Sequence, residues 1–589
     1  MFVIEIHFIF ATEIDIVIMT LIFKLLTKCN KLYKMKLKNH RRIYFAAILT
    51  FCLLQSVMPQ AVTPWLTSCD KSRLLQQQSS VSFGANAGTA NVTLTLNPTT
   101  TYQTMDGFGF CMTEASAEVI SSLSATQQSA LLTELFDKTT GLGISVLRIG
   151  IGATDLSSSD YSYNETAGDV TMSKFSLAGL DLNYLIPILK KALAINPNIK
   201  ILATPWSAPR WMKINTSSWI GSSLNTSYYA AYAKYFVKYF DAMKAQGINI
   251  WAITPQNEPE NGSNEPSMLM TSTEQKNFIN NNLGPEMAAA GYSGIKIIAY
   301  DHNCSNTTYP IDVCNNSTYV DGAAFHLYSG DISALTTVKN ATGKNVYFTE
   351  QYTASTGSFS GDFAWHLLNV VIGSITNSAK AVIEWNVASN SAFGPRTNGG
   401  CVACQGAITV NSSTAYSRNV SYYIIGQLSK FVNAGAVRIG TTCTSGGYIQ
   451  AAFKNPDGTL AALLYNSKTS SQVFKIVVGT QAFLYTIPAS TAATFVWNPN
   501  VNALSDVRVN DLVLSPNPVK DIISVSNISN NISYHTLNIV SINGATMLTQ
   551  TILPDEITTK INVSQLSSGI YILRLNGDSG SSYGRFIKN

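Results

Sequence analysis

The sequence predicts an α/β protein built on a (β/α)8 TIM barrel, with a side β-sandwich and a small C-terminal all-β domain. From residue 105 to about residue 432, strand-like runs alternate with helical patterns, as they do where crossover helices connect parallel strands. Eight such units over about 330 residues are typical of a closed barrel. The flanking sequence instead alternates short strands and tight turns without a helical period, which indicates separate β-structure.

The eight expected barrel strands are short runs rich in β-branched and apolar residues. Most of them are separated by periodic segments such as residues 229–246, where Tyr232, Tyr235, Phe236 and Tyr239 recur at helical spacing. We expect these aromatic side chains to pack against the sheet. The expected strands are residues 105–112, 145–151, 199–204, 250–255, 295–300, 322–328, 345–349 and 381–386.

Domain boundaries are expected where these patterns change. A strand-like segment before the barrel is expected to join the strands after it in one β-sandwich. The assignment is an upstream piece at 1–34, a signal peptide at 35–61, the β-sandwich at 80–104 and 433–498, the barrel at 105–432, a linker at 499–511 and a C-terminal β-domain at 512–589.

The N-terminal region has the pattern of an export signal. Residues 36–42 are basic and residues 43–58 are apolar, so cleavage is expected just before or at Ala61. We interpret Met35 as the true initiator, with a mis-assigned start upstream of it. The alternative is a membrane anchor over about residues 1–26, which three acidic residues inside the span disfavour. No stable membrane span is therefore expected after removal of the signal.

The composition suits an exported protein and argues against nucleic-acid binding. Charged residues make up 12% of the chain, about half the usual share, so that Ser, Thr, Asn and Gly supply much of the polar surface. The net charge of +5 rests partly on the basic N-terminal segment, and no long Lys/Arg patch follows it.

Seven cysteines follow the signal, and an odd number leaves at least one thiol unpaired in an exported protein. Two pairs are close in sequence, Cys304 with Cys314 and Cys401 with Cys404, and each could close a small loop as a disulfide. The second pair is a CxxC, but no second CxxC and no nearby His accompany it, which favours a disulfide over a redox or zinc site. Because we find no His, Asp and Cys cluster with suitable spacing, no metal or organic cofactor is expected.

Two glutamates stand at the ends of expected barrel strands. Glu258 closes the run WAITPQNE and Glu350 closes the run NVYFTE. Barrel enzymes hold their reactive groups at the C-terminal ends of the strands. Two carboxyl groups on one barrel mouth can act as proton donor and nucleophile, which is the arrangement for glycoside hydrolysis. Taken singly, each glutamate could equally be a solvated or paired strand-end residue.

The chain resembles glycoside hydrolase family 30, the glucosylceramidase-like enzymes, over about residues 100–498. By this resemblance Glu258 is the acid/base and Glu350 the nucleophile of a secreted retaining β-glycosidase that cleaves β-D-glucosidic bonds through a covalent intermediate. The matching motifs occur in the family's order: DGFGFCMTEASA at 106–117, ATPWSAP at 203–209, QNEP at 256–259, FHLY at 325–328, FTE at 348–350 and EWN at 384–386.

The same resemblance implies a set of substrate contacts. Glu114 is expected to bind sugar hydroxyls, because a carboxylate accepts from two adjacent hydroxyl groups. Trp206 and Trp385 are expected to line the glucose pocket, where an indole face packs on a pyranose ring. Asn257 is expected to hydrogen-bond the 2-hydroxyl, a contact that strengthens in the transition state.

Three further residues are expected around the nucleophile. Arg148, at the end of the second strand, could hold Glu350 ionised through its charge. His326 and Tyr328 end the sixth strand and are expected beside Glu350. For every site residue other than the two glutamates, the alternative is a purely structural role, in which the side chain is buried and hydrogen-bonded and does not contact substrate.

Departures from the family pattern concern specificity. Cys111, Leu327 and Glu384 replace residues frequent in the family, and the loop at 398–404 resembles loops of the bacterial and fungal β-1,6-glucanase branch. The resemblance thus implies an endo-β-1,6-glucanase or a glucosylceramidase-like enzyme, with a β-glucan or glucoside as substrate. Two other hypotheses stay open: a catalytically inactive surface carbohydrate-binding protein, and a redox protein that uses the CxxC.

The tail resembles the C-terminal sorting domain of the type IX secretion system of Bacteroidetes. The pattern consists of LSPNPV at 514–519, LSSGIY at 566–571 and the terminal GRFIKN. This implies contact with the secretion machinery and release or attachment at the outer cell surface. A small carbohydrate-binding β-module is the alternative.

Overall fold

The computed structural model describes most of the chain beyond the expected signal. The upstream piece, nearly all of the expected signal peptide and nearly all of the expected linker lie outside the described residues. Within the described part of the chain, no helix is both long and apolar enough to cross a membrane. The described residues are 60–84, 88–445, 448–499, 512–526, 534–541, 546–552, 558–577 and 580–589.

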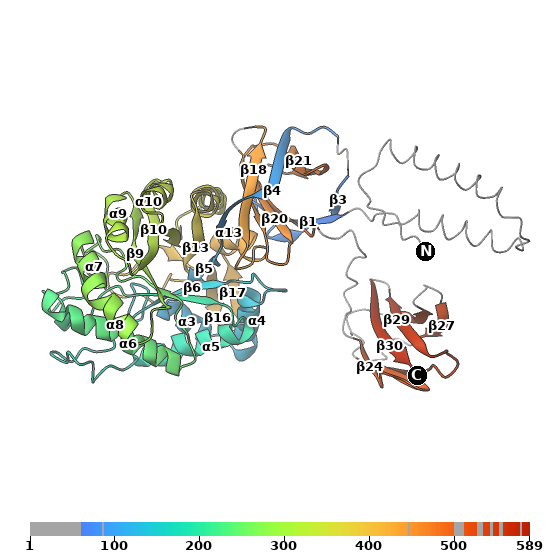
Figure 1. Cartoon of the computed structure of the whole chain (residues 1–589), viewed down its shortest axis with the longest axis horizontal. Helices are drawn as coiled ribbons and strands as arrows, with labels where there is room; N and C mark the ends of the chain where they lie inside the picture. The colour runs from blue at the N-terminus through green and yellow to red at the C-terminus, as the bar shows by residue number, and fades with distance from the viewer. Residues whose placement is uncertain are drawn as a thin grey trace, which may run out of the picture. The chain divides into compact units, whose positions relative to one another are not determined.

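The eight expected strands form a closed parallel barrel, which confirms the predicted fold class (Figure 1). Around the barrel their order is β10-β11-β13-β5-β6-β7-β8-β9. The strands are β5 (Gly107–Cys111), β6 (Val146–Gly150), β7 (Lys200–Thr204), β8 (Ala252–Ile253), β9 (Lys296–Cys304), β10 (Val320–Gly330), β11 (Asn345–Glu350) and β13 (Ala379–Asn386).

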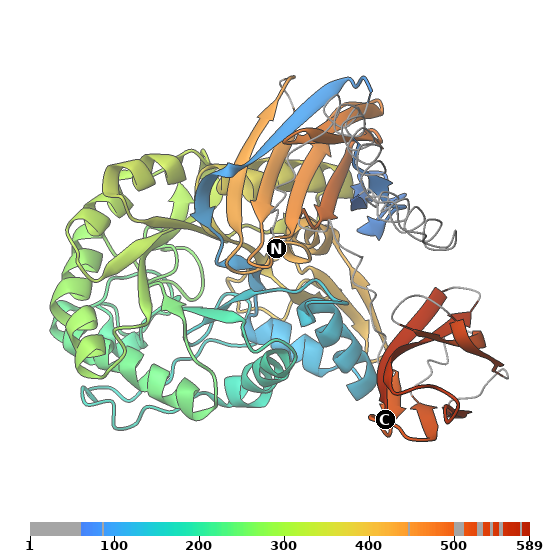
Figure 2. The same ribbon diagram turned by 45° about the vertical axis from the view of Figure 1, so that its right-hand side comes forward.

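Helices surround this barrel (Figure 2). The longest, α6 (Tyr229–Ala245), buries Tyr232, Tyr235, Phe236 and Tyr239, so its aromatic residues pack in the core as expected. The others are α3 (Glu114–Ser121), α4 (Ala125–Phe136), α5 (Ile186–Ile195), α7 (Ser272–Phe278), α8 (Gly284–Ala289), α9 (Thr308–Asn315), α10 (Ala334–Thr342), α11 (Phe359–Trp365), α12 (Gly373–Thr376) and α13 (Val420–Ser429).

An apolar plug fills the inside of the barrel. Nearly every strand contributes one inward residue, so the lower barrel is a packed core rather than a channel. The polar side chains at the C-terminal strand ends lie above this plug and face the mouth. The plug consists of Val146, Leu202, Ala252, Ile298, Ala324, Tyr347, Ala381 and Ile383.

The β-sandwich is a ten-stranded sheet that curls round, so that Gly84 beside one edge bridges to Ala482 at the other. Strand β4 (Val92–Thr104) lies between two strands that come some 350 residues later, as the blue ribbon among orange ones shows (Figure 2). The remaining strands are β1 (Ala61–Ser68), β2 (Gln76–Gln77), β3 (Val81–Ser82), β18 (Val437–Cys443), β19 (Ile449–Lys454), β20 (Leu460–Asn466), β21 (Gln472–Val478), β22 (Gln481–Ile487) and β23 (Thr491–Trp497).

Strand β1 was not expected in this sheet. Its residues 63–68 pair antiparallel with β23, and Val62 and Leu66 are buried in the sandwich core. The period-2 pattern of β1 directly follows the apolar signal segment, which masks it in the sequence. β1 also begins at Ala61, the last residue of the expected signal.

The C-terminal unit is all-β, as expected, and has its own apolar core. Its two sheets are β24-β25-β28 and β27-β26-β29-β30. The sequence showed only some of these strands, since the others are short and lack strong alternation. They are β24 (Val513–Ser515), β25 (Ile522–Ser526), β26 (Tyr534–Ser541), β27 (Thr546–Thr551), β28 (Thr558–Asn562), β29 (Gly569–Gly577) and β30 (Gly580–Lys588).

The cysteine predictions are half right. Cys401 and Cys404 form a disulfide, whereas Cys304 and Cys314 are both free and buried, so the expected bridge between them is wrong. Cys304 ends β9, whereas Cys314 lies near the end of the helix α9. Cys314 is thus about 9 Å along the helix axis from the first residue of α9. Both thiols pack as small apolar groups in the barrel core.

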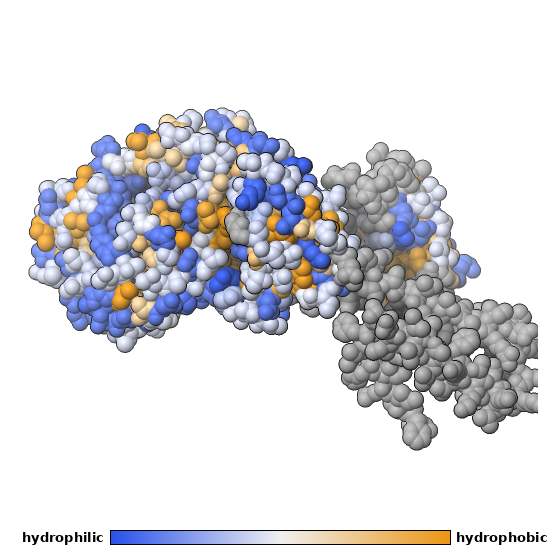
Figure 3. Space-filling model, turned by 90° about the horizontal axis from the view of Figure 1, so that it is seen from above, coloured by the Kyte–Doolittle hydropathy of each residue, from blue (hydrophilic) through white to orange (hydrophobic). Residues whose placement is uncertain are grey.

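The surface matches the low share of charged residues. Figure 3 shows apolar residues scattered in small patches among polar ones on the visible face. Such a distribution is normal for a soluble domain and marks no single large apolar contact area on this face.

Candidate active site

Glu258 stands in a strained turn five residues beyond the end of β8. Its φ of 43° lies in the left-handed region, which a residue other than glycine adopts at a cost of about 1–3 kcal/mol. Backbone contacts hold the turn: the N–H of Glu258 donates to the carbonyl of Asp301 at 3.0 Å, and that of Asn257 donates to Pro205 at 2.8 Å. The strain is therefore maintained by neighbouring strands, and it turns both side chains to the mouth.

Glu350 ends β11 on the same rim. Its Oε2 accepts from the Arg148 guanidinium at 2.6 Å, and its Oε1 accepts from the Tyr328 hydroxyl at 3.0 Å. Tyr328 is 39% exposed, so it reaches from Glu350 to solvent.

Arg148 connects the polar groups of the mouth. Its side chain is fully buried, and besides Glu350 it donates to Asn257 at 2.6 Å and to Asp301 at 2.8 Å. The guanidinium also lies over the ring of Trp206, 4.7 Å from the centroid. One cation thus orients two carboxylates and an amide, because the planar guanidinium has several donors in fixed directions.

Asp301 is a site residue that the sequence reasoning missed. Besides Arg148, it accepts hydrogen bonds from Thr254 at 2.7 Å and Thr349 at 2.6 Å, and it contacts His326 Nε2 at 3.1 Å. Although burial opposes its charge, Arg148 and His326 hold the pKa of Asp301 far below its usual range. A signal existed, since Asp301 directly follows the expected fifth strand, but that strand was predicted to end at residue 300 and β9 continues to Cys304.

His326 brings the two glutamates together. Its Nδ1 lies 3.2 Å from Oε1 of Glu258 and 3.6 Å from Oε1 of Glu350. The two oxygens are therefore no farther apart than the sum of these distances, about 6.8 Å. This limit fits the separation of about 5–5.5 Å in retaining glycosidases and excludes nearly all of the inverting range of about 6.5–9.5 Å.

The charges of this cluster are strongly coupled. Burial raises the pKa of Glu350, and the charges of His326 and Arg148 offset only part of that effect. Burial also acts on Glu258, but contacts with His302 and His326 outweigh it and hold the pKa of Glu258 well below its usual range. Burial lowers the pKa of His326, whereas the carboxylates of Glu350, Asp301 and Glu258 raise it to about 9. In the free site, the proton thus rests on His326.

The two expected tryptophans pair with each other, and Glu114 lies in a separate contact network. Trp206 and Trp385 have ring centroids 5.5 Å apart. Glu114 is 2% exposed and accepts from the backbone of Ser158 at 2.8 Å, and its other oxygen has no hydrogen-bond partner among the described residues. Burial raises the pKa of Glu114 to about 7. In the described part of the chain, no hydrogen bond or ion pair joins Glu114 to the two mouth glutamates.

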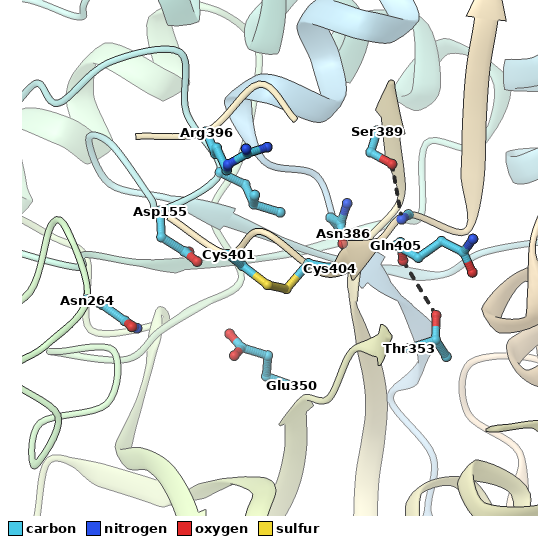
Figure 4. Close-up of a disulfide and its surroundings, with 12 residues drawn as sticks. Asp155, Asn264, Glu350, Thr353, Asn386, Ser389, Arg396, Cys401, Cys404 and Gln405 are labelled. Atoms are coloured by element: carbon cyan, nitrogen blue, oxygen red, sulfur yellow. Dashed lines mark hydrogen bonds between the residues drawn. A yellow bond between two sulfur atoms is a disulfide. The ribbon is translucent and has the colours of Figure 1, made fainter. Parts of the chain in front are cut away.

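Asp155, which the sequence reasoning also missed, lies in the loop after β6 beside the disulfide. Figure 4 shows the carboxyl groups of Asp155 and Glu350 facing the same space next to Cys401 and Cys404. Burial, together with the charges of Glu350 and Glu258, raises the pKa of Asp155 to about 7. The loop that carries the disulfide is tied down by Thr397, whose N–H donates to the Asp155 carbonyl at 3.1 Å.

The fold also creates a ligand cluster that the sequence spacing did not reveal. Glu258, His302 and His326 each offer one ligand atom, and these atoms lie within 4.8 Å of one another. The three residues come from different strand ends, 24 to 68 positions apart, so no compact motif marks them. The expected absence of a metal rested on spacing along the sequence, which does not reveal this group, and it stays a prediction.

The barrel matches the family model described as the glycosyl hydrolase family 30 TIM-barrel domain over residues 105–432, more than half of the chain. The chain belongs to glycoside hydrolase family 30. The β-sandwich domain of family 30 matches residues 435–495, and a secretion system C-terminal sorting domain matches residues 514–589. The protein is accordingly a glycosidase, and its sorting domain marks it as secreted or placed on the cell surface.

Relatives within family 30 include glucanases and glucosylceramidases. The endo-1,6-β-D-glucanase of Neurospora crassa is 32% identical over 73% of this chain and 93% of its own length. The endo-1,6-β-D-glucanase neg1 of Aspergillus fumigatus is 35% identical over 62% of this chain and 79% of its own length. Putative glucosylceramidase 4 of Caenorhabditis elegans is 31% identical over 64% and 78%. Among solved structures, the endo-β1,6-glucanase BT3312 is 37% identical with a TM-score of 0.70, covering 74% of this chain and 99% of that one.

Proposed function

We propose that the protein is a secreted, retaining endo-β-1,6-glucanase in which Glu350 is the nucleophile and Glu258 the acid/base. The observation that carries this proposal is the convergence of both carboxyl groups on His326, within about 6.8 Å of each other. At that separation a sugar fits between them, but an additional attacking water on the opposite face does not.

In the first step, an oxygen of Glu350 bonds to the anomeric carbon while the bond to the leaving oxygen breaks and takes the proton of Glu258. In the second step, Glu258 removes a proton from water, which attacks the anomeric carbon and releases Glu350. Arg148 and Tyr328 direct donors at Glu350, so they stabilise the carboxylate before attack and again as it leaves.

The proton on His326 reconciles this mechanism with the low pKa of Glu258. Asp301 is ionised and needs a donor, so Nε2 of His326 carries hydrogen and Nδ1 faces Glu258. The pair therefore holds one proton, which passes between Nδ1 and Oε1, two atoms 3.2 Å apart. The proton passes to Glu258 for the first step. Bonding of Glu350 to the anomeric carbon then removes a neighbouring negative charge, which favours the ionised Glu258 that acts as base in the second step.

The choice of a β-1,6-glucan rests on the relatives and on the loop with the disulfide. Three curated or solved endo-1,6-β-glucanases are 32–37% identical to this chain. Asp155, held beside Cys401, presents a carboxyl group to the space above Glu350, where it would accept from sugar hydroxyls. Asn257 would donate to the 2-hydroxyl, because Arg148 already occupies its Oδ1.

Digestion of pustulan, a linear β-1,6-glucan, alongside glucosylceramide tests this function. We expect oligosaccharides of mixed length from pustulan and little glucose from glucosylceramide. Glucosylceramide turnover without pustulan cleavage would overturn the substrate, and pustulan binding without any product would support the inactive binding protein instead.

Variants test the two roles. Glu350→Ala should abolish turnover but be rescued by azide with formation of an inverted glycosyl azide, because the anion replaces the missing nucleophile. Glu134→Ala is the matched control, since Glu134 is a barrel glutamate that pairs with Arg418 away from the mouth. Azide rescue in Glu258→Ala with inversion, and none in Glu350→Ala, would show that the roles are reversed.

We further propose that export uses the type IX system, with the C-terminal β-domain contacting the secretion machinery. Deletion of residues 512–589 should retain the enzyme inside the cells of a host that has this system. Undiminished export of the truncated chain would contradict this route.

A further inference from the structure

The three-residue cluster at Glu258 has the spacing of a metal site. Oε1 of Glu258 lies 3.2 Å from Nδ1 of His326 and 3.7 Å from Nδ1 of His302. In a tetrahedral zinc site with bonds of about 2.0–2.1 Å, neighbouring ligand atoms are about 3.4 Å apart. These two separations bracket that value, and all three ligand atoms lie within 4.8 Å of one another, so the side chains can close around an ion.

Asp301 contacts the ring nitrogen of His326 that faces away from the cluster, as a carboxylate does in many metal sites. Its Oδ1 contacts Nε2 of His326 at 3.1 Å, while Arg148 pairs with Oδ2 and keeps the carboxylate charged. Nε2 therefore keeps its hydrogen, and once the proton shared with Glu258 has left, the lone pair of Nδ1 points into the cluster. Metal-binding histidines typically have this carboxylate support on the opposite ring nitrogen.

His302 provides separate evidence for a cation site. The residue is 8% exposed, and its Nδ1 has no hydrogen-bond partner among the described residues. A buried polar atom without a partner costs about 1–3 kcal/mol, and a bound cation would satisfy it. The other oxygen of Glu258 is held by Asn261 at 2.7 Å and Asn264 at 3.1 Å, which leaves Oε1 to face both imidazoles.

We propose that Glu258, His302 and His326 bind a borderline divalent cation such as Zn²⁺, with water or Oε1 of Glu350 as the fourth ligand. Glu350 Oε1 lies 3.6 Å from Nδ1 of His326, within reach of the same ion. Two imidazoles and one carboxylate suit Zn²⁺, Cu²⁺ or Ni²⁺ rather than Mg²⁺ or Ca²⁺, which prefer oxygen ligands. Binding releases the proton that Glu258 and His326 share.

Such a cation inhibits the enzyme. It takes the oxygen of Glu258 that must exchange a proton with the leaving group, and it occupies the position of that group. Cation and substrate therefore exclude each other. This consequence rests on the proposed function, whereas the binding site itself does not.

Titration of the tag-free protein with Zn²⁺ by calorimetry, and with Co²⁺ by visible absorption, tests the site. We expect one ion per chain, a tetrahedral Co²⁺ spectrum and inhibition of pustulan hydrolysis that is competitive with substrate. His302→Gln should weaken binding at least about 10-fold, since loss of even a supporting contact costs about that much. His366→Gln is the matched control, because His366 is equally buried and pairs with Glu384 at 2.7 Å elsewhere.

Circular dichroism and the unfolding temperature show whether each variant folds. If His302→Gln does not fold, Glu258→Gln serves instead, since it replaces the anionic ligand by an amide. Absence of binding up to roughly 1 mM, or unchanged affinity in the folded ligand variant, would overturn the site. Binding that leaves hydrolysis unaffected would retain the site but contradict Glu258 as the acid/base.

Discussion

Replacement of Arg148 by Met should both destabilise the barrel and shift its pH dependence. Arg148 is fully buried and forms ion pairs with Glu350 at 2.6 Å and Asp301 at 2.8 Å. At such distances and an effective dielectric constant of about 20, each pair contributes about 6 kcal/mol of attraction. Removal of one partner of a buried pair typically costs about 3–5 kcal/mol, because the remaining charge is left uncompensated.

The same change should raise the pKa of Glu350. Arg148 is one of the two charges that hold this pKa down, and a neighbouring guanidinium typically lowers the pKa of a carboxyl group by about 1–3 units. The nucleophile must be ionised, so the acidic limb of kcat/KM should move to higher pH by about that amount. Arg148→Lys, which keeps one charge, should show a smaller shift.

Denaturant unfolding and the pH profile of kcat/KM measure both effects. Arg438→Met is the matched control: Arg438 is a partly buried arginine that donates to Gln103 and has no carboxylate partner among the described residues. Its loss should cost only about 1 kcal/mol. If Arg148→Met unfolds at the same denaturant concentration as the wild type and the acidic limb of its kcat/KM profile is unchanged, Arg148 does not stabilise the ionised Glu350.

Three further predictions concern other parts of the chain. Burial raises the pKa of Asp181 to about 6, so the free energy of unfolding should fall by about 3 kcal/mol as the pH rises from about 4 to 6, and Asp181→Asn should remove this step in pH-dependent unfolding curves. Cys401→Ser should lower the unfolding free energy by up to about 2 kcal/mol and raise the KM for pustulan, because the loop beside Asp155 loses the disulfide with Cys404. An unchanged KM would contradict a role of this loop in binding. Thiol titration of the unfolded, unreduced protein from residue 60 onward should find the five free cysteines, whereas three would mean that Cys304 and Cys314 are bridged after all.

Local sequence patterns were sufficient to predict the barrel. Each strand is a contiguous run, and the helix α6 repeats its aromatic residues every three or four positions, so the information lies within a short window of sequence. The same holds for Glu258 and Glu350, because each lies at or shortly after the end of a strand-like run. Strand β1 escaped this reasoning, since its alternation is short and adjoins an apolar segment.

The residues around the two glutamates required the closed barrel. Asp301 and His302 follow the expected fifth strand and Asp155 follows the second, and nothing in their immediate sequence relates them to Glu258 or Glu350. Barrel closure places them at one mouth, where hydrogen bonds and charges act over a few ångströms regardless of separation along the chain. Cys304 and Cys314 show the converse, since residues only ten positions apart are kept unpaired by the helix between them.

The sequence by itself thus determined the fold class, the family and the two glutamates at the strand ends. Only the tertiary structure decided how these glutamates share a proton with His326, which cation compensates Glu350, and which side chains could hold a metal ion beside Glu258. The physical reason is that periodicity reports local backbone structure, whereas electrostatic coupling depends on distances that exist only after the first and last strands of the barrel have met.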